Sequence, residues 1–508
     1  MHIGTDRRGM VVVRRVVCSV VCVLMLVAGW TAVAGADPSS RAGSASPMVS
    51  GPVTGGNGVP IVFAHTTFPL ASVGYTQQEF FVGGTATAYA PSAPLTSDGR
   101  WSVVPSSHAT YKTRIVVDRP IRRRDFNGTV VVEWLNVTGG VDASPDWIHM
   151  HDELIRAGYA WVGVSAQAVG LNALKNPANA SPAFGDPVRY ASLTHPGDSY
   201  SYDMFSQAGE AVRNTAKVLG GFHLKRLIGV GESQSAGRLV TYIDAVHPRA
   251  HVYDGFLVHS RGASGAPLSQ APLATVGTPT PTFIRTDLRV PVLQFETETD
   301  LIELGFLAAR QPDTRRIATW EVTGTAHFDL YGLQTGATDM GDLQSVAAWF
   351  ASMQHPTNTP TTGFTCGLPI NSGPQTFVLR AAIAAVNRWI ASGVHPPASP
   401  RMETTNTTPP QLVVGPDGIV RGGIRTPAVD APVAKLSGLG QTGGTQFCNI
   451  FGTTVPFTNQ QLTARYRNHG GFAFAWILAT IDSARAGFLR PVDAFNLAVV
   501  GARSDVLR

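Results

Sequence analysis

The chain has 508 residues, of which 44% are hydrophobic and 14% charged, with 53 Gly and 35 Pro. This length and composition predict a globular, loop-rich protein with a large core. The formal net charge of +5 falls to +2 without residues 1–36, which contain four arginines and one aspartate. The rest of the chain therefore lacks the excess of basic residues expected of a protein that binds nucleic acid or an anionic membrane.

Residues 1–36 have the pattern of a secretory signal peptide. Two arginine pairs, Arg7-Arg8 and Arg14-Arg15, precede an apolar stretch over residues 16–33, and Ala34-Gly35-Ala36 follows it. A basic start, an apolar core and an A-x-A site are typical of such signals. We expect cleavage near Ala36 and an exported protein, secreted or associated with the cell envelope, with no stable membrane insertion after removal. The alternative is a retained membrane anchor, because the apolar stretch is nearly long enough to span a bilayer.

The next segments differ in pattern. Residues 37–74 are predicted to be a flexible lead-in, because residues 37–60 are rich in Ser, Gly, Pro and Ala. From Tyr75 to Val117, short runs such as 79–82 and 111–117 alternate with turn residues. This alternation is typical of β-strands and predicts a β-rich N-terminal segment.

Further along, apolar runs alternate with helical patterns. The predicted strands are 129–132, 160–164, 227–230, 255–258, 290–293 and 319–322, and the predicted helices are 146–157, 203–219, 235–246 and 375–394. Such a sequence predicts an α/β fold, in which helices cover both faces of a mostly parallel sheet. Functional loops of these sheets gather at the carboxyl ends of the strands.

The domain organisation follows from these patterns. The main α/β domain is predicted over residues 75–394, and residues 328–373, which are rich in Gly, Thr and Pro, are predicted to be a cap insertion in it. Residues 395–508 are predicted to form a C-terminal extension packed on this domain, because they lack a complete alternating pattern of their own. Helical patterns are found in this extension near 460–467, 471–486 and 491–501.

The stretch Gly231-Glu232-Ser233-Gln234-Ser235 has the pattern of a nucleophile elbow. It lies between the apolar run 227–230 and a helical pattern, so the predicted local structure is strand, sharp turn and helix. The residue at the apex of such a turn has a strained backbone and needs small residues two positions before and after it. Both Ser233 and Ser235 meet this condition. We favour Ser233, because the alternative register would place Glu232 in a buried strand, where an unpaired carboxylate is costly.

A serine nucleophile needs a base to accept its proton and an acid to orient that base. In this kind of fold the acid and then the histidine follow the serine, each in a loop after a late strand. His327 follows the strand that ends near Val322 and is the candidate base. Asp300 lies deepest in the loop after the preceding strand and is the candidate acid. Glu298 shares that loop and is the alternative.

Backbone N–H groups near the serine are expected to stabilise an oxyanion. Gln234 follows the nucleophile and supplies the first N–H. The second is expected from the loop after the strand that ends near Trp134, where Thr138, Gly139 and Gly140 allow a close approach of the backbone. Asn136 begins a glycosylation pattern in the same loop, which we interpret as an accidental match.

Of the four cysteines, Cys18 and Cys22 lie in the predicted signal peptide, which leaves Cys366 and Cys448. In an exported protein these two most simply form one disulfide, and two free buried thiols are the alternative. His149 and His151 resemble a pair of metal ligands, but side chains two residues apart on a helix point in different directions. We therefore expect neither a metal nor another cofactor.

These motifs resemble those of the α/β-hydrolase superfamily and, more narrowly, of the secreted bacterial α/β-hydrolase-domain proteins. The matching stretches are residues 126–137, 231–238, 324–327 and 422–427, which spread over most of residues 50–500. The resemblance implies an α/β-hydrolase fold that includes the C-terminal extension, and it implies the serine–acid–histidine set. It does not specify a substrate.

The sequence thus predicts an exported serine hydrolase that cleaves a carboxylic ester through Ser233, His327 and Asp300 and an acyl-enzyme. The expected partner is a small-molecule or lipid-like ester and not a nucleic acid. An amide, thioester or lactone would use the same groups. The contrasting hypothesis is a non-catalytic secreted binding protein on the same scaffold. The complete set of serine, acid and histidine in the correct order argues against it.

Overall fold

A computed structural model of the chain describes residues 46–56, 61, 63–176, 178 and 185–508. These residues belong to one compact unit, Ala45–Arg508. The predicted signal peptide, residues 1–36, lies outside the described residues.

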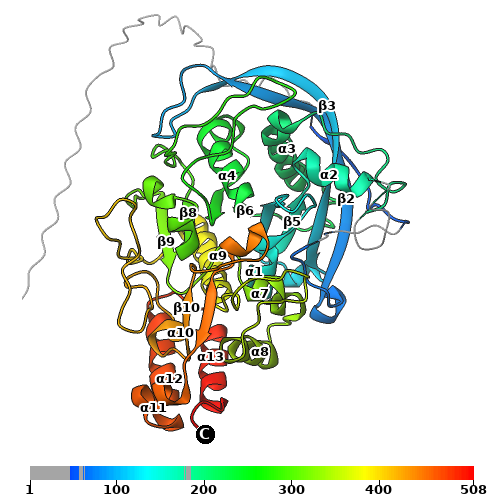
Figure 1. Cartoon of the computed structure of the whole chain (residues 1–508). Coiled ribbons are helices and arrows are strands. Elements are labelled where there is room, and N and C mark those ends of the chain that lie inside the picture. Colours follow the sequence, from blue (N-terminus) through cyan, green and yellow to red (C-terminus); the bar gives the residue numbers. More distant parts are fainter. Residues whose placement is uncertain (1–45, 57–60, 62, 177, 179–184) are drawn as a thin grey trace, which may run out of the picture. The chain divides into compact units, whose positions relative to one another are not determined.

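A single large sheet forms the centre of this unit (Figure 1). Nine strands of the described chain join it in the order β1-β2-β3-β5-β4-β6-β7-β8-β9. The strands are β1 (Met48–Ser50), β2 (Tyr75–Pro91), β3 (Val103–Pro120), β4 (Thr129–Trp134), β5 (Ala160–Val164), β6 (Arg226–Glu232), β7 (Gly255–His259), β8 (Val292–Thr297) and β9 (Ile317–Val322). The strands from β5 to β9 in this order pair in parallel, whereas β1, β2, β3 and β5 pair antiparallel.

Helices cover both faces of the sheet because the side chains of a strand alternate between its faces and are apolar on both of them. On β4, Val130 and Val132 pack in one apolar cluster and Val131 packs in another. The first cluster includes side chains of α3 (Ser201–Asn214) and α4 (Gln234–Thr241), and the second includes those of α1 (Pro145–Arg156) and α9 (Gln375–Ser392). The predicted α/β fold, with a mostly parallel sheet, helices on both faces and a β-rich N-terminal segment, is confirmed.

The C-terminal part of the chain adds a second, smaller layer. The strands β10 (Ala434–Ser437) and β11 (Thr453–Pro456) pair antiparallel. Three helices follow these strands in the chain: α11 (Asn459–Tyr466), α12 (His469–Arg485) and α13 (Pro491–Arg503). They share an apolar cluster with β10 and with α8 (Leu343–Gln354). Figure 1 shows α8 and α13 side by side, and Gln354 Nε2 donates to Asp505 Oδ1 at 3.1 Å just beyond α13. Residues 343–354 and 459–503 therefore pack as one layer.

Several elements differ from the predicted ones. The strand predicted from residue 290 begins at Val292, because Pro291 has no N–H for the strand ladder. The helix predicted over 203–219 ends at Asn214, and tight turns that finish at Gly220 and Gly221, both with positive φ, replace its last part. The helix predicted over 235–246 changes to a π-helical turn at Tyr242–Val246. Met48–Ser50, within the predicted lead-in, pairs with β2.

Other elements were not predicted at all, among them α2 (Ala168–Lys175), α8, β10 and β11. None of the helices in the described residues has the length and apolar character to cross a membrane.

Candidate active site

Ser233 occupies a sharp turn between β6 and α4, as the elbow pattern predicts. Its φ of 60° and ψ of −120° are unusual for a residue other than glycine. The Ser233 N–H donates to the His259 carbonyl at 3.0 Å, and the Gly237 N–H donates to the Ser233 carbonyl at 3.1 Å. A Cβ on Gly231 would stand 3.0 Å from the Ser235 carbonyl oxygen, so a larger residue there would press on the turn.

The structure brings Ser233, His327 and Asp300 into direct contact. Ser233 Oγ is 2.7 Å from His327 Nε2, and His327 Nδ1 is 2.6 Å from Asp300 Oδ1. The three residues come from the carboxyl ends of β6, β9 and β8. Parallel strands bring these ends to one edge of the sheet, which is why residues so far apart in sequence meet here.

Asp300 and Glu298, the two candidate acids, have different partners. Asp300 is fully buried, and its Oδ2 accepts hydrogen bonds from the N–H and the hydroxyl of Thr297, both at 2.7 Å. Glu298 is also fully buried, but it accepts from the N–H groups of Gly324 and Gly438 at 2.7 and 2.8 Å. Only Asp300 of the two contacts His327 in the described structure. Both belong to the short helix α6 (Glu298–Ile302) rather than to the predicted loop.

The charges in the site reinforce this contact. Burial alone would raise the pKa of Asp300, but the charge of His327 and its hydrogen bond, with those from Thr297, outweigh burial and lower it. Burial likewise would lower the pKa of His327, but the nearby carboxylates of Glu232 and Asp300 outweigh it and raise this pKa above 6.5. The site thus favours an ionised Asp300 and stabilises the protonated form of His327.

Glu232 is a residue of the site that the sequence did not reveal. Its Oε1 lies 3.3 Å from His327 Nε2, on the nitrogen that also faces Ser233. Its Oε2 accepts a hydrogen bond of 3.1 Å from Asn136 Nδ2. Burial, opposed by the charge of His327 and assisted by Asp146 and Asp300, raises the pKa of Glu232 to about 8.

The prediction that Ser233 at the apex keeps Glu232 out of a buried strand is wrong. Glu232 is buried at the end of β6 even with Ser233 at the apex, and Asn136 and His327 are its partners there. What separates the two serines is geometry. Ser235 is fully buried in the first turn of α4, and its hydroxyl has no hydrogen-bond partner among the described residues.

The predicted oxyanion loop has its own hydrogen-bond pattern. The Thr138 N–H donates to Asn136 Oδ1 at 2.8 Å, and the Gly140 N–H donates to the Val137 carbonyl at 2.9 Å. Within the described residues, no acceptor is recorded for the N–H of Gly139 or of Gln234, the first residue of α4. Asn136, the first residue of the glycosylation pattern, is buried with its amide bonded to Glu232.

The histidines of α1 have structural partners. His149 Nε2 faces Asp329 Oδ1 at 3.2 Å, and His151 Nε2 faces the Asp339 carbonyl at 2.8 Å. His259 lies beneath the elbow, between Asp146 and Gln375. In the part of the chain that the structure describes, no group of three or more His, Cys, Asp or Glu is arranged to hold a metal ion.

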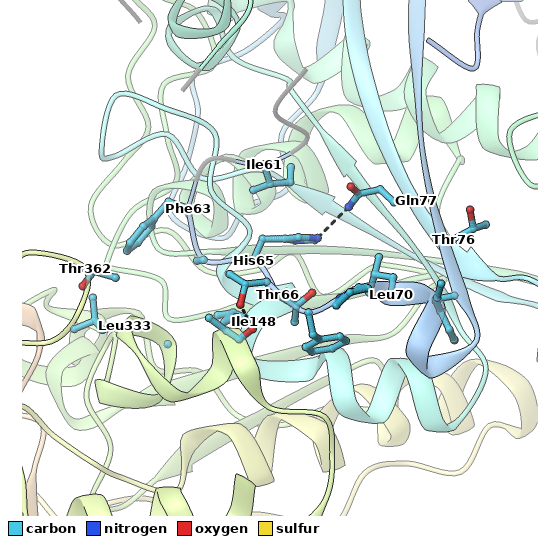
Figure 2. A pocket seen from close by; sticks show the side chains of 18 residues that line it. Ile61, Phe63, His65, Thr66, Leu70, Thr76, Gln77, Ile148, Leu333 and Thr362 are labelled. Atoms are coloured by element: carbon cyan, nitrogen blue, oxygen red, sulfur yellow. Dashed lines mark hydrogen bonds between the residues drawn. The ribbon is translucent and has the colours of Figure 1, made fainter. Parts of the chain in front are cut away.

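A cavity of about 400 Å³ adjoins the reactive groups. Residues that line it include Ser233, His327, Glu232, Thr138 and Gly139, so the predicted nucleophile, base and oxyanion loop face one space. A second cavity of about 610 Å³ lies beside it and shares four lining residues with it, Phe63, Ala64, Leu333 and Thr362. Figure 2 shows Phe63, Leu333 and Thr362 at one side of that second cavity and Gln77 toward the other, with His65 between them. Neither Ser233 nor His327 lines the second cavity.

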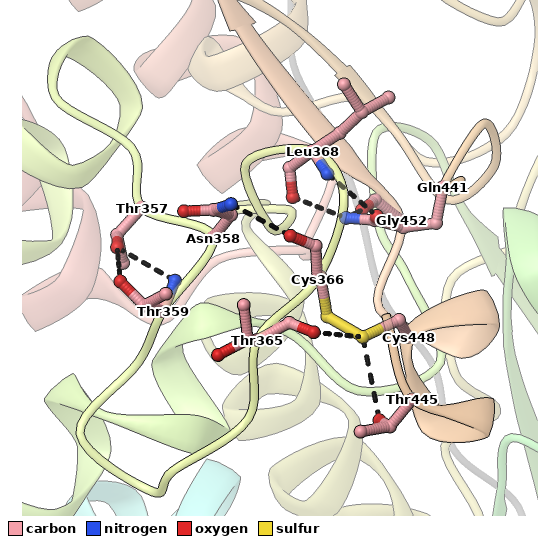
Figure 3. Close-up of a disulfide and its surroundings, with 10 residues drawn as sticks. All are labelled: Thr357, Asn358, Thr359, Thr365, Cys366, Leu368, Gln441, Thr445, Cys448 and Gly452. Carbon is pink, nitrogen blue, oxygen red and sulfur yellow. Dashed lines mark hydrogen bonds between the residues drawn. A yellow bond between two sulfur atoms is a disulfide. The ribbon is translucent and has the colours of Figure 1, made fainter. Parts of the chain in front are cut away.

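The predicted disulfide is present between Cys366 and Cys448 (Figure 3). It joins two segments that are 82 residues apart in sequence.

The sheet order, the turn at Ser233 and the contact of His327 with it define a protein of the α/β-hydrolase class. Residues 49–498 match the model of a family described as alpha/beta hydrolase domain. The chain belongs to this family, and it is a hydrolase.

Solved structures with a similar fold include several esterases. They include fungal esterases from Rhizomucor miehei, with 13% identity, coverage of 61% of this chain and 85% of the other, and a TM-score of 0.29. For a glucuronoyl esterase from Solibacter usitatus these values are 10%, 49%, 77% and 0.27, and for a carboxylesterase from Lactobacillus plantarum they are 11%, 46%, 81% and 0.26. No curated protein sequence matches this chain. The likenesses concern the fold and carry no information on the substrate of this chain.

Proposed function

We propose that the protein is an exported serine esterase in which Ser233, His327 and Asp300 form the catalytic triad. The observation that carries this proposal is the continuous chain of contacts from Ser233 Oγ to His327 Nε2 at 2.7 Å and from His327 Nδ1 to Asp300 Oδ1 at 2.6 Å. These contacts lie at the wall of a cavity large enough for a small ester.

In the first half of the reaction, Ser233 Oγ attacks the ester carbonyl while His327 Nε2 takes the hydroxyl proton. Asp300 holds the Nδ1–H side of His327 and stabilises the imidazolium that forms. The tetrahedral intermediate then collapses, the bond to the alcohol breaks, and His327 gives its proton to the leaving alcohol. In the second half, His327 takes a proton from water as the water oxygen attacks the acyl carbonyl. The bond to Ser233 Oγ then breaks, and His327 returns its proton to that oxygen, which releases the acid and restores Ser233.

Two backbone N–H groups are positioned to stabilise the oxyanion. The Gln234 N–H begins α4, where the helix dipole also favours negative charge. Of the two loop residues predicted for the second donor, Gly139 is the better candidate, because the Thr138 N–H already donates to Asn136. We therefore assign the oxyanion hole to Gln234 and Gly139, with Thr138 lining the cavity beside them.

Export is supported by the signal-like pattern of residues 1–36 and by the disulfide. Disulfides persist in oxidising compartments and are rare in the cytosol. The pair Cys366–Cys448 in a chain with a signal-like start is consistent with function outside the cytoplasm.

The proposal is tested by the hydrolysis of an activated small ester such as p-nitrophenyl acetate. We expect Ser233→Ala to lower kcat by about 10⁴-fold or more, because the nucleophile and the acyl-enzyme are lost together. Ser235→Ala is the matched control in the same turn and should retain most of the activity. A wild-type protein that is inert toward a panel of activated esters would refute the proposal and favour the non-catalytic binding protein.

A further inference from the structure

The lining of the cavity next to Ser233 has a polar and an apolar part. The polar part consists of Ser233, His327, Glu232, Asn136 and Thr138. The apolar part includes Leu333, Ile450 and five phenylalanines, which are Phe63, Phe328, Phe364, Phe447 and Phe451. We call these five rings the aromatic wall.

The rings of the aromatic wall contact one another, and Phe364 contacts three of the other four. Its centroid lies 5.3 Å from that of Phe451, 5.9 Å from that of Phe447 and 6.5 Å from that of Phe63. Phe63 in turn lies 6.2 Å from Phe328, the residue after His327. These distances and the edge-on angles of Phe364 are those of favourable aromatic pairs. The wall is therefore a packed surface rather than a set of isolated side chains.

The disulfide fixes the part of this wall that comes from loops. Cys366 is two residues beyond Phe364, and Cys448 directly follows Phe447. Beside the disulfide, Gln441 Nε2 donates to the carbonyls of Leu368 at 2.8 Å and Gly452 at 2.9 Å. The two loops are thus joined by a covalent bond and by hydrogen bonds at the place where they present their rings.

Charge further restricts what this cavity can hold. Among the described residues that line it there is no Lys or Arg, and the ionisable side chains of this set are Glu232 and His327. A carboxylate or phosphate on the bound group would meet aromatic rings without a counter-charge, which is strongly unfavourable. The lining selects an uncharged, apolar group.

The volume sets the size of that group. An apolar cavity of about 150 Å³ is enough to hold benzene. The cavity of about 400 Å³ leaves room for a ring of this size together with an ester group and a short connection.

From the aromatic wall, its attachment by the disulfide and the absence of Lys and Arg among the described lining residues, we propose that this site is specific for esters that carry an uncharged aromatic group. That group packs against Phe364 and its neighbours while the ester carbonyl lies at Ser233. This inference rests on the proposed esterase function and adds the class of substrate to it.

The test compares esters that differ only in the bulky group, with acid release followed by a pH indicator. Ethyl acetate is the small reference, ethyl phenylacetate places the ring on the acyl side, and benzyl acetate places it on the alcohol side. The 4-carboxy derivatives of the two aromatic esters test the effect of charge. We expect kcat/KM for at least one aromatic ester to exceed that for ethyl acetate by about tenfold or more, and the carboxylated derivative to lose this advantage.

Variants show whether the aromatic wall causes the preference. Phe364→Ala should lower kcat/KM for the preferred aromatic ester by more than it lowers kcat/KM for ethyl acetate, and so remove most of the preference. Phe364→Leu, which keeps an apolar side chain, should retain part of it. Phe474→Ala is the matched control, because Phe474 lies on α12 and is 67% exposed. If Phe364→Ala fails to fold, Phe364→Leu and the wild-type comparison with charged esters still decide the question.

The outcomes separate the two proposals. Equal kcat/KM for ethyl acetate and both aromatic esters, or a carboxylated ester that is hydrolysed as well as its parent, would overturn the substrate class alone. A wild-type protein that hydrolyses none of these esters and does not react with a fluorophosphonate would overturn the esterase function and the substrate class with it.

Discussion

Replacing Asp300 by Asn should nearly abolish activity, whereas replacing Glu298 by Gln should not. Both carboxylates are fully buried and lie two residues apart in α6. Of these two, only Asp300 contacts His327, at 2.6 Å, so of the two only Asp300 directly stabilises the imidazolium that forms as Ser233 loses its proton. An amide at position 300 removes that charge and can present N–H to His327, which favours the wrong tautomer.

The size of the effect follows from this geometry. The same change of a triad aspartate to asparagine in a serine protease lowers kcat by about 10⁴-fold, which corresponds to about 5 kcal/mol of transition-state stabilisation. We expect a loss of this order for Asp300→Asn. In Glu298→Gln, the carboxylate that accepts from the N–H groups of Gly324 and Gly438 becomes an amide with one acceptor oxygen. That change should cost about 1–3 kcal/mol of stability and leave the site geometry in place.

The assay is kcat/KM on p-nitrophenyl acetate for both variants, with urea unfolding measured on the same preparations. For Asp300→Asn we expect a large loss of activity with a modest loss of stability. For Glu298→Gln we expect nearly unchanged activity with a loss of about 1–3 kcal/mol of stability. Two mild activity defects, or a severe defect confined to Glu298→Gln, would refute the assignment of Asp300.

Three other predictions follow from the site and its surroundings. Ser235→Ala should leave the free energy of unfolding unchanged or raise it by about 1 kcal/mol, because it removes a buried hydroxyl that has no partner among the described residues. A decrease of the unfolding free energy by more than about 1 kcal/mol in a denaturant titration would contradict this reason. In wild type, activity should rise with pH as His327 loses its proton, and the pKa of His327 is raised above its usual value. Glu232→Gln removes a carboxylate that raises this pKa, so the acidic limb of the kcat/KM profile should move to lower pH. A limb that stays in place or moves to higher pH would show that Glu232 does not act on His327. The double variant Cys366→Ser/Cys448→Ser should lose about 2–4 kcal/mol of unfolding free energy under oxidising conditions, because the bond closes a sequence separation of 82 residues, and equal stability with wild type would contradict this.

The elements that the sequence predicted well are those with strong local patterns. The apolar run 227–230 and the small residues around Ser233 are enough to predict β6, the sharp turn and α4. The helix α6 was missed although it has a local signal: Thr297 and Asp300 form a capping box, which marks a helix start in sequence. Strands β10 and β11 have only four residues each, too few for a clear period of two.

The features that could not be predicted depend on contacts between distant residues. Glu232 meets Asn136 and His327, which are 96 and 95 positions away, so no local pattern records its burial or its raised pKa. The aromatic wall combines Phe63 with rings near positions 364 and 447, and only the folded chain brings them together. For the same reason the sequence alone did not suggest the substrate class.

The central claim is that Ser233 is the nucleophile, and peptide mapping of the covalent fluorophosphonate adduct tests it most directly. The reagent should add one phosphonyl group per chain, located by mass spectrometry on Ser233, and the Ser233→Ala variant should take up none. An adduct on Ser235 or on another residue, or a folded wild-type protein that stays unlabelled, would contradict the account.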